Sequence, residues 1–531
     1  MKVSSIMKKS ISYVSVVIFI AVMNGGCTQV GPDYVKPVAP ATPSVWEQNL
    51  SKSDHNITSW WKNFNDETLD LLVQKAYEEN LDLKSAGLRI LQARAALGIS
   101  EGLLFPQQQS VGGSAALNRS GSNTFGSAGV NFNIGWEMDV WGRYARGIQS
   151  AEATLYASVA SYDDILVSII SEVARNYINY RTSQERKAYA LRNIAIQERV
   201  TIMTEVQFNA GNVSELDMQQ ARTQLYSTRS RLPVLEISMI NSRNAIAILL
   251  GTIPEKIDPI LKKGSASQMQ YISTEVFKDL RDGIMPHDNI TFIPVAALDE
   301  NISIDTSLVL RRPDLQIAER QAQAQSARIG SAEAELYPHF SLFGTIGLNT
   351  NNALDGWISG SDMIGVSMGP TFNWNILQYD RIKNQIRIQD ALFQESLSHY
   401  NKKVLQAVGE ISNALNGYRF AKLQARYNKE AVDASTRAFN ISMIQYNNGL
   451  VTYQRLLSTV EKLTLNEDNL AQIQGKISNN VVALYKALGG GWQMGRGKAY
   501  VSDDMITQMR ARTDWSDYLD EDAMKLPKED K

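Results

Sequence analysis

Strict alternation of apolar and polar side chains marks the stretch that decides the fold, VNFNIGWEM at residues 130–138. A period of two is typical of a β-strand with one apolar face. The same alternation returns in IGVSMGPTFNW at residues 364–374. Trp136 and Trp374 lie near the ends of the two stretches and fit an aromatic girdle at a membrane edge, although a single tryptophan is as often ordinary core.

A partner strand is expected before each of these stretches, at 111–117 and at 340–348, with polar turns at 118–126 and 349–361. The strands approach the 9 to 11 residues that cross a bilayer when tilted. The apolar positions face outward and the small or polar positions inward. This arrangement predicts outer-membrane barrel strands, although any half-buried sheet also alternates.

The two strand regions belong to an internal duplication with a constant shift of about 238 positions. It predicts a first repeat at 60–251 and a second at 308–489, joined by a connector at 252–307. Seven identities keep this register, and they are Trp136 and Trp374, Arg143 and Arg381, Glu172 and Glu410, Tyr180 and Tyr418, Gln207 and Gln445, Gly211 and Gly449, and Gly251 and Gly489.

Each repeat also carries helical periodicity on both sides of its hairpin. Helices are expected at 67–103 and 314–336, ending near Pro106 and Pro338. Very long helices follow at 144–208 and 381–446, each about 100 Å at 1.5 Å per residue. Return helices at 213–250 and 451–488 cover their apolar stripes as antiparallel pairs. Pro233 predicts a kink or break in the first return helix, where the second has Ala471.

The N-terminus reads as a lipoprotein targeting segment. Residues 1–26 have a positive start and a short apolar run, as in a signal peptide. Cys27, the only cysteine, lies where a lipobox cysteine is acylated, although Asn24 replaces the usual aliphatic residue; a chance cysteine beside an ordinary cleavage site is the alternative. Residues 27–59 form a proline-rich strap. The tail at 490–531 is charged and weakly periodic, so from Lys498 onward we expect surface or disorder.

Composition argues against several functions. The 531 residues have a net charge of -2 and a mean hydropathy of -0.23, so no basic field for nucleic acid exists. No run approaches the 18 to 20 apolar residues of a spanning helix, which leaves strands to cross a membrane. The four histidines share no metal-ligand spacing, and no phosphate-binding loop appears. We therefore expect no enzyme, no cofactor and no metal site.

Four strands per chain cannot close a barrel, which needs about eight or more. Unpaired backbone groups facing lipid cost several kcal/mol each. Three copies would supply twelve strands and twelve helical staves, so the sequence predicts an obligate homotrimer. The expected fold class is an α+β membrane protein, a trimeric twelve-stranded outer-membrane barrel continued by a barrel of long helices, which the resemblance described next places in the periplasm.

Several short motifs recur in a fixed order along the chain, and they are GPDY at 31–34, WEMDVWGR at 136–143, LRRPDL at 310–315, ER at 319–320, ARIG at 327–330, YP at 337–338 and YNNG at 446–449. These motifs resemble those of the outer-membrane factors of tripartite efflux pumps, the TolC-like channels, in their lipid-anchored OprM-like or NodT-type branch. The resemblance covers about 27–489. It implies an exit duct in outer-membrane lipid that conducts small molecules and docks to a membrane-fusion adaptor and a resistance-nodulation-division transporter.

The resemblance also suggests site residues at the helix-to-helix turns. In the family these turns touch the adaptor, and here they carry Gly211, Asn212, Gly449 and Leu450. Side chains just beyond the turns close the resting aperture, and the matching positions are Tyr446 and Asp217. The second repeat departs from the family, with Arg455 and Ser458 where aspartates are usual. Arg455 either pairs with Asp217 or a neighbouring carboxylate, or is a plain solvated charge.

Two other functions remain open from the sequence. A lipid-tethered helical scaffold would need no alternating hairpins. A type I protein secretion channel would share the whole architecture, and the lipobox and strap favour small molecules over it. The cargo is not readable, because the selecting sites of such a system would lie in the partner transporter.

Overall fold

The computed structural model describes residues 29–40, 57–121, 123–262, 292–296, 309–352 and 360–526. The chain forms two compact units, each assembled from segments of both repeats. The first comprises Met1–Ala39, Arg89–Ala160 and Leu315–Lys403. The second comprises Pro40–Leu88, Ser161–Asp314 and Val404–Lys531.

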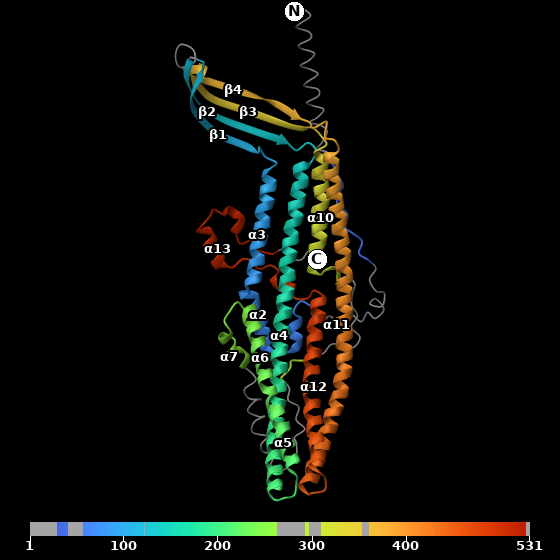
Figure 1. Cartoon of the computed structure of the whole chain (residues 1–531). Helices are drawn as coiled ribbons and strands as arrows, with labels where there is room; N and C mark the ends of the chain where they lie inside the picture. The colour runs from blue at the N-terminus through green and yellow to red at the C-terminus, as the bar shows by residue number, and fades with distance from the viewer. Residues whose placement is uncertain are drawn as a thin grey trace, which may run out of the picture. The chain divides into compact units, whose positions relative to one another are not determined.

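The first unit contains one antiparallel sheet with the strand order β1-β2-β3-β4 (Figure 1). Its strands are β1 (Gln108–Ser120), β2 (Asn123–Met138), β3 (His339–Asn351) and β4 (Ile364–Asn373). The two hairpins expected from the sequence are present, and β2 pairs with β3 to join them. The expected turn at 118–126 is wrong in extent, since the strands run to Ser120 and resume at Asn123.

The pairing register places the alternating side chains on opposite faces of the sheet. Val111, Phe132, Ile346 and Val366 are direct partners across all four strands, and all four are exposed. The next row on the other face is polar, where Thr345 donates a hydrogen bond of 3.0 Å to Asn133. One face is therefore an uncovered apolar surface and the other carries polar ladders.

Helices flank the sheet in sequence. In the first repeat α2 (Glu67–Glu79) and α3 (Leu81–Gly102) precede it, and in the second α10 (Pro313–Ala334) does. The single helix expected at 67–103 is interrupted at Asn80, whose backbone is extended and whose side chain accepts a hydrogen bond from the Leu83 amide at 2.9 Å. Asn80 thus acts as an N-cap that starts α3.

The second unit contains the long helices α4 (Arg143–Asn209) and α11 (Arg381–Asn447) from Ser161 and Val404 onward, together with their return helices. Both long helices have 67 residues, and their ends are offset by the shift of the duplication. The first return is broken into α5 (Glu215–Arg229) and α6 (Arg231–Leu249), whereas α12 (Tyr453–Ala487) is continuous. Pro233 lies in the first turn of α6, and because proline lacks an N–H and clashes with the preceding turn, the predicted break is confirmed.

Contacts within this unit order the helices as α5, α4, α12 and α11 (Figure 1). Arg229 of α5 pairs with Glu198 of α4 at 2.5 Å, and Arg192 of α4 contacts Glu467 of α12. Asn466 of α12 donates to Ser435 of α11 at 3.1 Å. α4 and α12 are thus inner helices of this row, and α5 with α6 and α11 form its two edges.

The C-terminal segment is folded up to Leu526, so the alternative of disorder for the tail is wrong there, whereas many of its residues are exposed, as the alternative of a surface segment predicts. It forms η5 (Trp492–Gly495), α13 (Asp503–Arg510) and η6 (Ser516–Leu519). Arg496 pairs with the buried Asp163 at 2.5 Å and lies over the Trp492 ring. The sequence of this segment shows no regular spacing of apolar residues, because they are buried one at a time at irregular intervals. The buried ones are Trp492, Tyr500, Val501, Ile506, Leu519, Met524 and Leu526.

One described helix, α4, contains an 18-residue window with a mean hydropathy of 1.2, and a bent pair at Glu215–Leu249 and Pro254–Lys262 passes the same test of length and composition. This departs from the expectation that no run is apolar enough to span. Half of the α4 window is buried inside the structure. A core helix passes such a test as readily as a spanning one, so packing within the protein accounts for its apolar character.

Candidate functional site

The exposed apolar face of the sheet is the first candidate surface. Hydrophobic patches of this extent are rare on soluble monomers and mark a membrane or a partner. Every strand contributes to it, through Val111 and Leu117, Val130, Phe132 and Ile134, Leu342, Ile346 and Leu348, and Ile364, Val366, Met368 and Phe372. The chemistry of this face is that of a lipid contact.

Trp136 and Trp374 lie at equivalent places in the two repeats. The indole N–H of Trp136 donates to the Leu104 carbonyl at 3.0 Å, and that of Trp374 to the Leu336 carbonyl at 2.9 Å. Each indole therefore ties the end of a strand to the turn that follows the preceding helix. The structure gives both residues a structural contact, and their role at a membrane edge stays a prediction.

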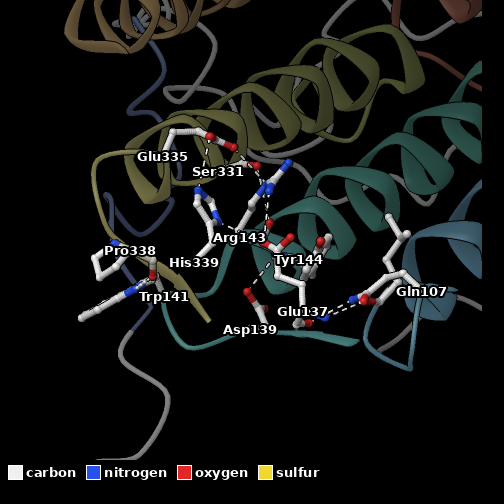
Figure 2. A network of polar contacts seen from close by, with 11 residues as sticks. Gln107, Glu137, Asp139, Trp141, Arg143, Tyr144, Ser331, Glu335, Pro338 and His339 are labelled. Atoms are coloured by element: carbon white, nitrogen blue, oxygen red, sulfur yellow. Dashed lines mark hydrogen bonds and ion pairs between the residues drawn. The ribbon is translucent and has the colours of Figure 1, made fainter. Parts of the chain in front are cut away.

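Four charged or titratable side chains form a closed ring where the sheet meets the helices (Figure 2). Arg143 contacts Glu137 at 3.2 Å and Glu335 at 3.1 Å. His339 reaches the same two carboxylates, with Nδ1 3.0 Å from Glu137 and Nε2 3.5 Å from Glu335. We call these four residues the corner ring; it joins β2, β3, α4 and the turn after α10.

Neighbouring side chains fix the backbone around the corner ring (Figure 2). Asp139 caps α4 by accepting hydrogen bonds from the amides of Tyr144 at 3.0 Å and Ala145 at 2.7 Å. Trp141 donates to the Pro338 carbonyl at 2.9 Å. The ring links side chains of four segments, and Asp139 and Trp141 hold the backbone next to them. The ring therefore positions the corner and supplies no nucleophile. His339 is the first residue of β3, and nothing in the sequence indicated its carboxylate partners.

The strap is bound to the first unit through a glycine contact and a buried arginine. A side chain on Gly31 would lie 2.3 Å from the Cα of Gly330, so only glycine fits. Arg146, almost fully buried, donates to the carbonyls of Val30 and Gly31 and pairs with Asp33 at 3.0 Å. The strap is thus fixed between Gln29 and Asp33. Cys27 lies outside the described residues, and its acylation stays a prediction.

The two helix-to-helix turns have the same geometry in both repeats. Gly211 and Gly449 have φ values of 74° and 69°, the left-handed region that favours glycine. Asn212 donates its amide to Gln207 at 2.9 Å, and Leu450 donates to Gln445 at 2.8 Å. These are Schellman C-caps. The four predicted docking residues therefore lie in pairs, two at each of two equivalent, exposed turns.

The three predicted gate residues have different environments. Asp217 accepts hydrogen bonds from the amide of Ser214 at 3.1 Å and from its hydroxyl at 2.7 Å, as part of a capping box. Tyr446 is buried, packs against Tyr453, and lies 3.4 Å from the Thr204 hydroxyl. Arg455 is exposed. Within the described part of one chain no ion pair joins Asp217 to Arg455.

α4 carries a row of buried polar side chains that was not predicted from the sequence. Arg192 and Asn193 both contact the buried Glu467 of α12. Glu185 is fully buried and accepts hydrogen bonds from the amides of Phe292 at 2.9 Å and Ile293 at 3.4 Å. Burial raises the pKa of Glu185 to about 7, against the opposing effect of these two amides. The only sequence signal for these buried polar residues is the recurrence of a charged residue inside the apolar stripe of the helix.

Metal chemistry has no support in the described residues, where no group of three or more histidine, cysteine or acidic side chains is arranged to hold an ion. The described residues form an exposed apolar sheet face, a corner held by ion pairs and hydrogen bonds, and two exposed helix turns. Together they define a class of protein, the outer-membrane channel built from a sheet and long helices.

Comparison with known proteins identifies the family. The model of the outer membrane efflux protein family matches residues 72–252 and 306–490, and the chain belongs to this family. It is similar to nodulation protein T of Rhizobium leguminosarum bv. trifolii, with 26% identity over 89% of this chain and 96% of the relative. It also resembles the pyoverdine export outer membrane protein OpmQ of Pseudomonas aeruginosa, with 27% identity over 86% and 92% of the two chains.

Solved structures agree with this assignment. The outer-membrane channel OprN is 27% identical, with a TM-score of 0.75 over 87% of this chain and 99% of that one. The predicted fold class is thereby confirmed, with four strands per chain beside long helices in two repeats. The chain is an outer-membrane efflux channel, located in the outer membrane and extending into the periplasm. The family is one of channels.

Proposed function

We propose that this protein is the exit duct of a tripartite efflux pump, acting as a homotrimer that passively conducts small molecules delivered by an inner-membrane transporter and a periplasmic adaptor. The observation that carries this proposal is the sheet. Its apolar face is uncovered in one chain, and its strand order leaves β1 and β4 as edges.

The sheet edges support the trimer. A four-stranded sheet in lipid leaves two rows of backbone groups without partners, which costs several kcal/mol per group. Joining β4 of one copy to β1 of the next, three times, closes a ring of twelve strands. Pro370 lies in β4 opposite Leu342, and β4 is an edge of the sheet within one chain, where proline is tolerated.

The turns around Gly211 and Gly449 support docking to an adaptor. They are exposed, identical in geometry and rigid, so three copies would present six equivalent knobs. Side chains at such turns can bind a partner without being needed for the fold. Asn212 and Leu450, which both lie exposed, are the residues we assign to this contact.

We place the aperture just beyond the turns. Asp217 and Arg455 are the charged residues there, and Tyr446 supports them from the buried cluster with Phe439 and Tyr453. Asp217 is held by Ser214 within its own chain, so its pairing with Arg455 would have to occur between copies. Arg455→Ala is expected to raise resting conductance if such a pairing shuts the pore.

The anchor completes the proposal. We assign acylation to Cys27, two residues before the fixed part of the strap at Gln29, so the acyl chains would enter the membrane beside the first unit. SilC, a relative from Salmonella typhimurium described as a probable outer membrane lipoprotein, supports this assignment. Metabolic labelling with a clickable fatty acid should label the wild type and not Cys27→Ser.

A pair of adjacent substitutions in β4 tests the duct. Val366 lies on the apolar face and Ser367 on the polar face. A lysine on a lipid-facing strand costs about 2 to 4 kcal/mol at mid-membrane, whereas a lumen position tolerates charge. Val366→Lys should therefore abolish trimers in detergent, and Ser367→Lys should assemble and change single-channel conductance in planar bilayers. Equal effects of the two variants, or no wild-type conductance, would contradict the proposal.

A further inference from the structure

The helical row of the second unit ends in two uncovered edges, α11 on one side and α5 with α6 on the other. α4 has a return helix on each flank, α5 and α12, whereas α11 has a return helix, α12, on one flank only. Near its end α11 also touches α4, where Tyr446 lies 3.4 Å from the Thr204 hydroxyl. The exposed apolar side chains gather on the edges, as Leu405, Phe420, Leu423, Tyr427, Ile441 and Ile444 of α11 and Leu216, Tyr226, Val234, Ile237, Ile240 and Ile248 of α5 and α6.

The duplication tells which residues should meet across these edges. In the row, a long helix of the first repeat contacts the return helix of the second, α4 with α12. The equivalent contact joins the long helix of the second repeat, α11, to the return helix of the first, α5 with α6. One chain cannot make it, because these helices are at opposite ends of its row, and the missing partner is a second copy of this chain.

Applying the shift of 238 to the buried ion pair gives a reversed pair. Arg192 of α4 corresponds to Glu430 of α11, and Glu467 of α12 corresponds to Arg229 of α5. The acid and the base have exchanged helices, so the equivalent contact is again of opposite charge. Glu430 is exposed and makes no ion pair within the described residues of its own chain.

The neighbouring contacts are also complementary. Gly475 of α12 approaches Thr182 of α4, where an added side chain would lie 2.2 Å from the Thr182 hydroxyl. The equivalent residues are Ile237 of α6 and Phe420 of α11, which are 57% and 64% exposed. Phe420 also lines a groove of about 780 Å³ between α11 and α12, deep enough to receive an apolar side chain. The close approach of Gly475 to Thr182 thus corresponds to a contact between two larger apolar side chains, Ile237 and Phe420.

We infer that Glu430 of one copy pairs with Arg229 of the next, with Ile237 of that copy packed against Phe420 at the mouth of the groove. This inference rests on the proposed homotrimer and names the contact that closes its helical ring. The interface repeats the α4 and α12 contact inside the chain, with its charges exchanged.

Crosslinking with a short bismaleimide tests the contact in the full-length protein in detergent. Glu430→Cys combined with Arg229→Cys should yield covalent trimers on denaturing gels, and each single variant should yield monomers. The matched control is Lys429→Cys with Arg229→Cys, because Lys429 corresponds to Leu191 and not to Arg192. Equal crosslinking of the control, or only intramolecular product, would overturn the inference.

Charge reversal provides the second measurement. Arg229 also pairs with Glu198 in its own chain, so all variants carry Glu198→Gln. Glu430→Arg and Arg229→Glu should each lower the temperature at which trimers dissociate, and the double variant should recover at least half of the loss. If the losses in dissociation temperature of the two single variants add up in the double variant while trimers still form, the pair of Glu430 and Arg229 is overturned and the trimer is not. A wild type that is monomeric by native mass spectrometry would instead overturn the proposed trimer.

Discussion

The long helices α4 and α11 are equal in length and equivalent in sequence position, yet they are buried to very different extents. Beyond Ser161, α4 buries an almost continuous stripe, including Leu166, Ile170, Val173, Tyr177, Ile178, Ile196 and Val200. The same stretch of α11 leaves Leu405, Phe420 and Tyr427 largely exposed. Duplication has preserved geometry but not environment, since α4 lies inside the row of helices and α11 lies at its edge.

The largest expected effect comes from breaking the buried pair on α4. Glu467→Ala leaves Arg192, which is 6% exposed, without its carboxylate partner. Removing one member of a buried pair costs about 3 to 5 kcal/mol, because the other charge remains desolvated. Urea unfolding in detergent, followed by circular dichroism, should show this loss.

The edge helix supplies the matched control for that measurement. Glu430→Ala at the equivalent pair on α11 should cost about 0 to 1 kcal/mol, as for an exposed ion pair. Replacing both buried partners, as Arg192→Met with Glu467→Leu, should recover most of the stability. Similar losses for Glu467→Ala and Glu430→Ala would contradict the distinction between inner and edge helices.

A second effect concerns the connector. Glu185 of α4 holds it by accepting the amide of Phe292, whereas α11 has Leu423 at the position equivalent to Glu185. The pKa of Glu185 rises from 4.5 to about 7 through burial. The folded state therefore holds a proton that the unfolded state has released. The stability from this proton is fully present below about pH 4.5 and is lost as the pH rises through about 7. A pKa rise of this size corresponds to about 3 kcal/mol.

Glu185→Gln isolates this dependence, because its amide oxygen still accepts the amides of Phe292 and Ile293 without a charge. At pH 8 the variant should be more stable than the wild type by about 3 kcal/mol, and at pH 5 by much less. Glu236→Gln, at an exposed position paired with Lys187, serves as the control and should show no such difference. Parallel pH profiles for wild type and Glu185→Gln would refute a proton held at this site.

Local patterns predicted the elements well, because each depends on residues close in sequence. Alternation at 130–138 gave the strand and its apolar face, and Pro233 gave the broken return helix. Gly211 and Gly449 marked the turns, since only a left-handed residue closes a Schellman cap there. The duplication carried each of these predictions from one repeat to the other.

Contacts between distant segments could not be predicted in the same way. No period links Glu185 to the amide of Phe292, 107 positions away, or Arg496 to Asp163, 333 positions away. The folded tail was missed because isolated anchors such as Trp492 and Leu519 produce no pattern in sequence. The gate residues rest on a resemblance, whereas the capping role of Asp217 follows from Ser214 three residues before it, the spacing of a capping box.

The smallest expected effect should be equal in the two repeats. Trp136→Phe and Trp374→Phe each remove an indole donor from a backbone carbonyl, at Leu104 and at Leu336, while keeping an aromatic ring. The loss of one such hydrogen bond costs about 1 kcal/mol. The two variants should therefore lower the dissociation temperature of the trimer by similar amounts. Because both indoles close equivalent junctions, a clear effect at only one of them would show that the two repeats differ in environment here as well, as α4 and α11 do.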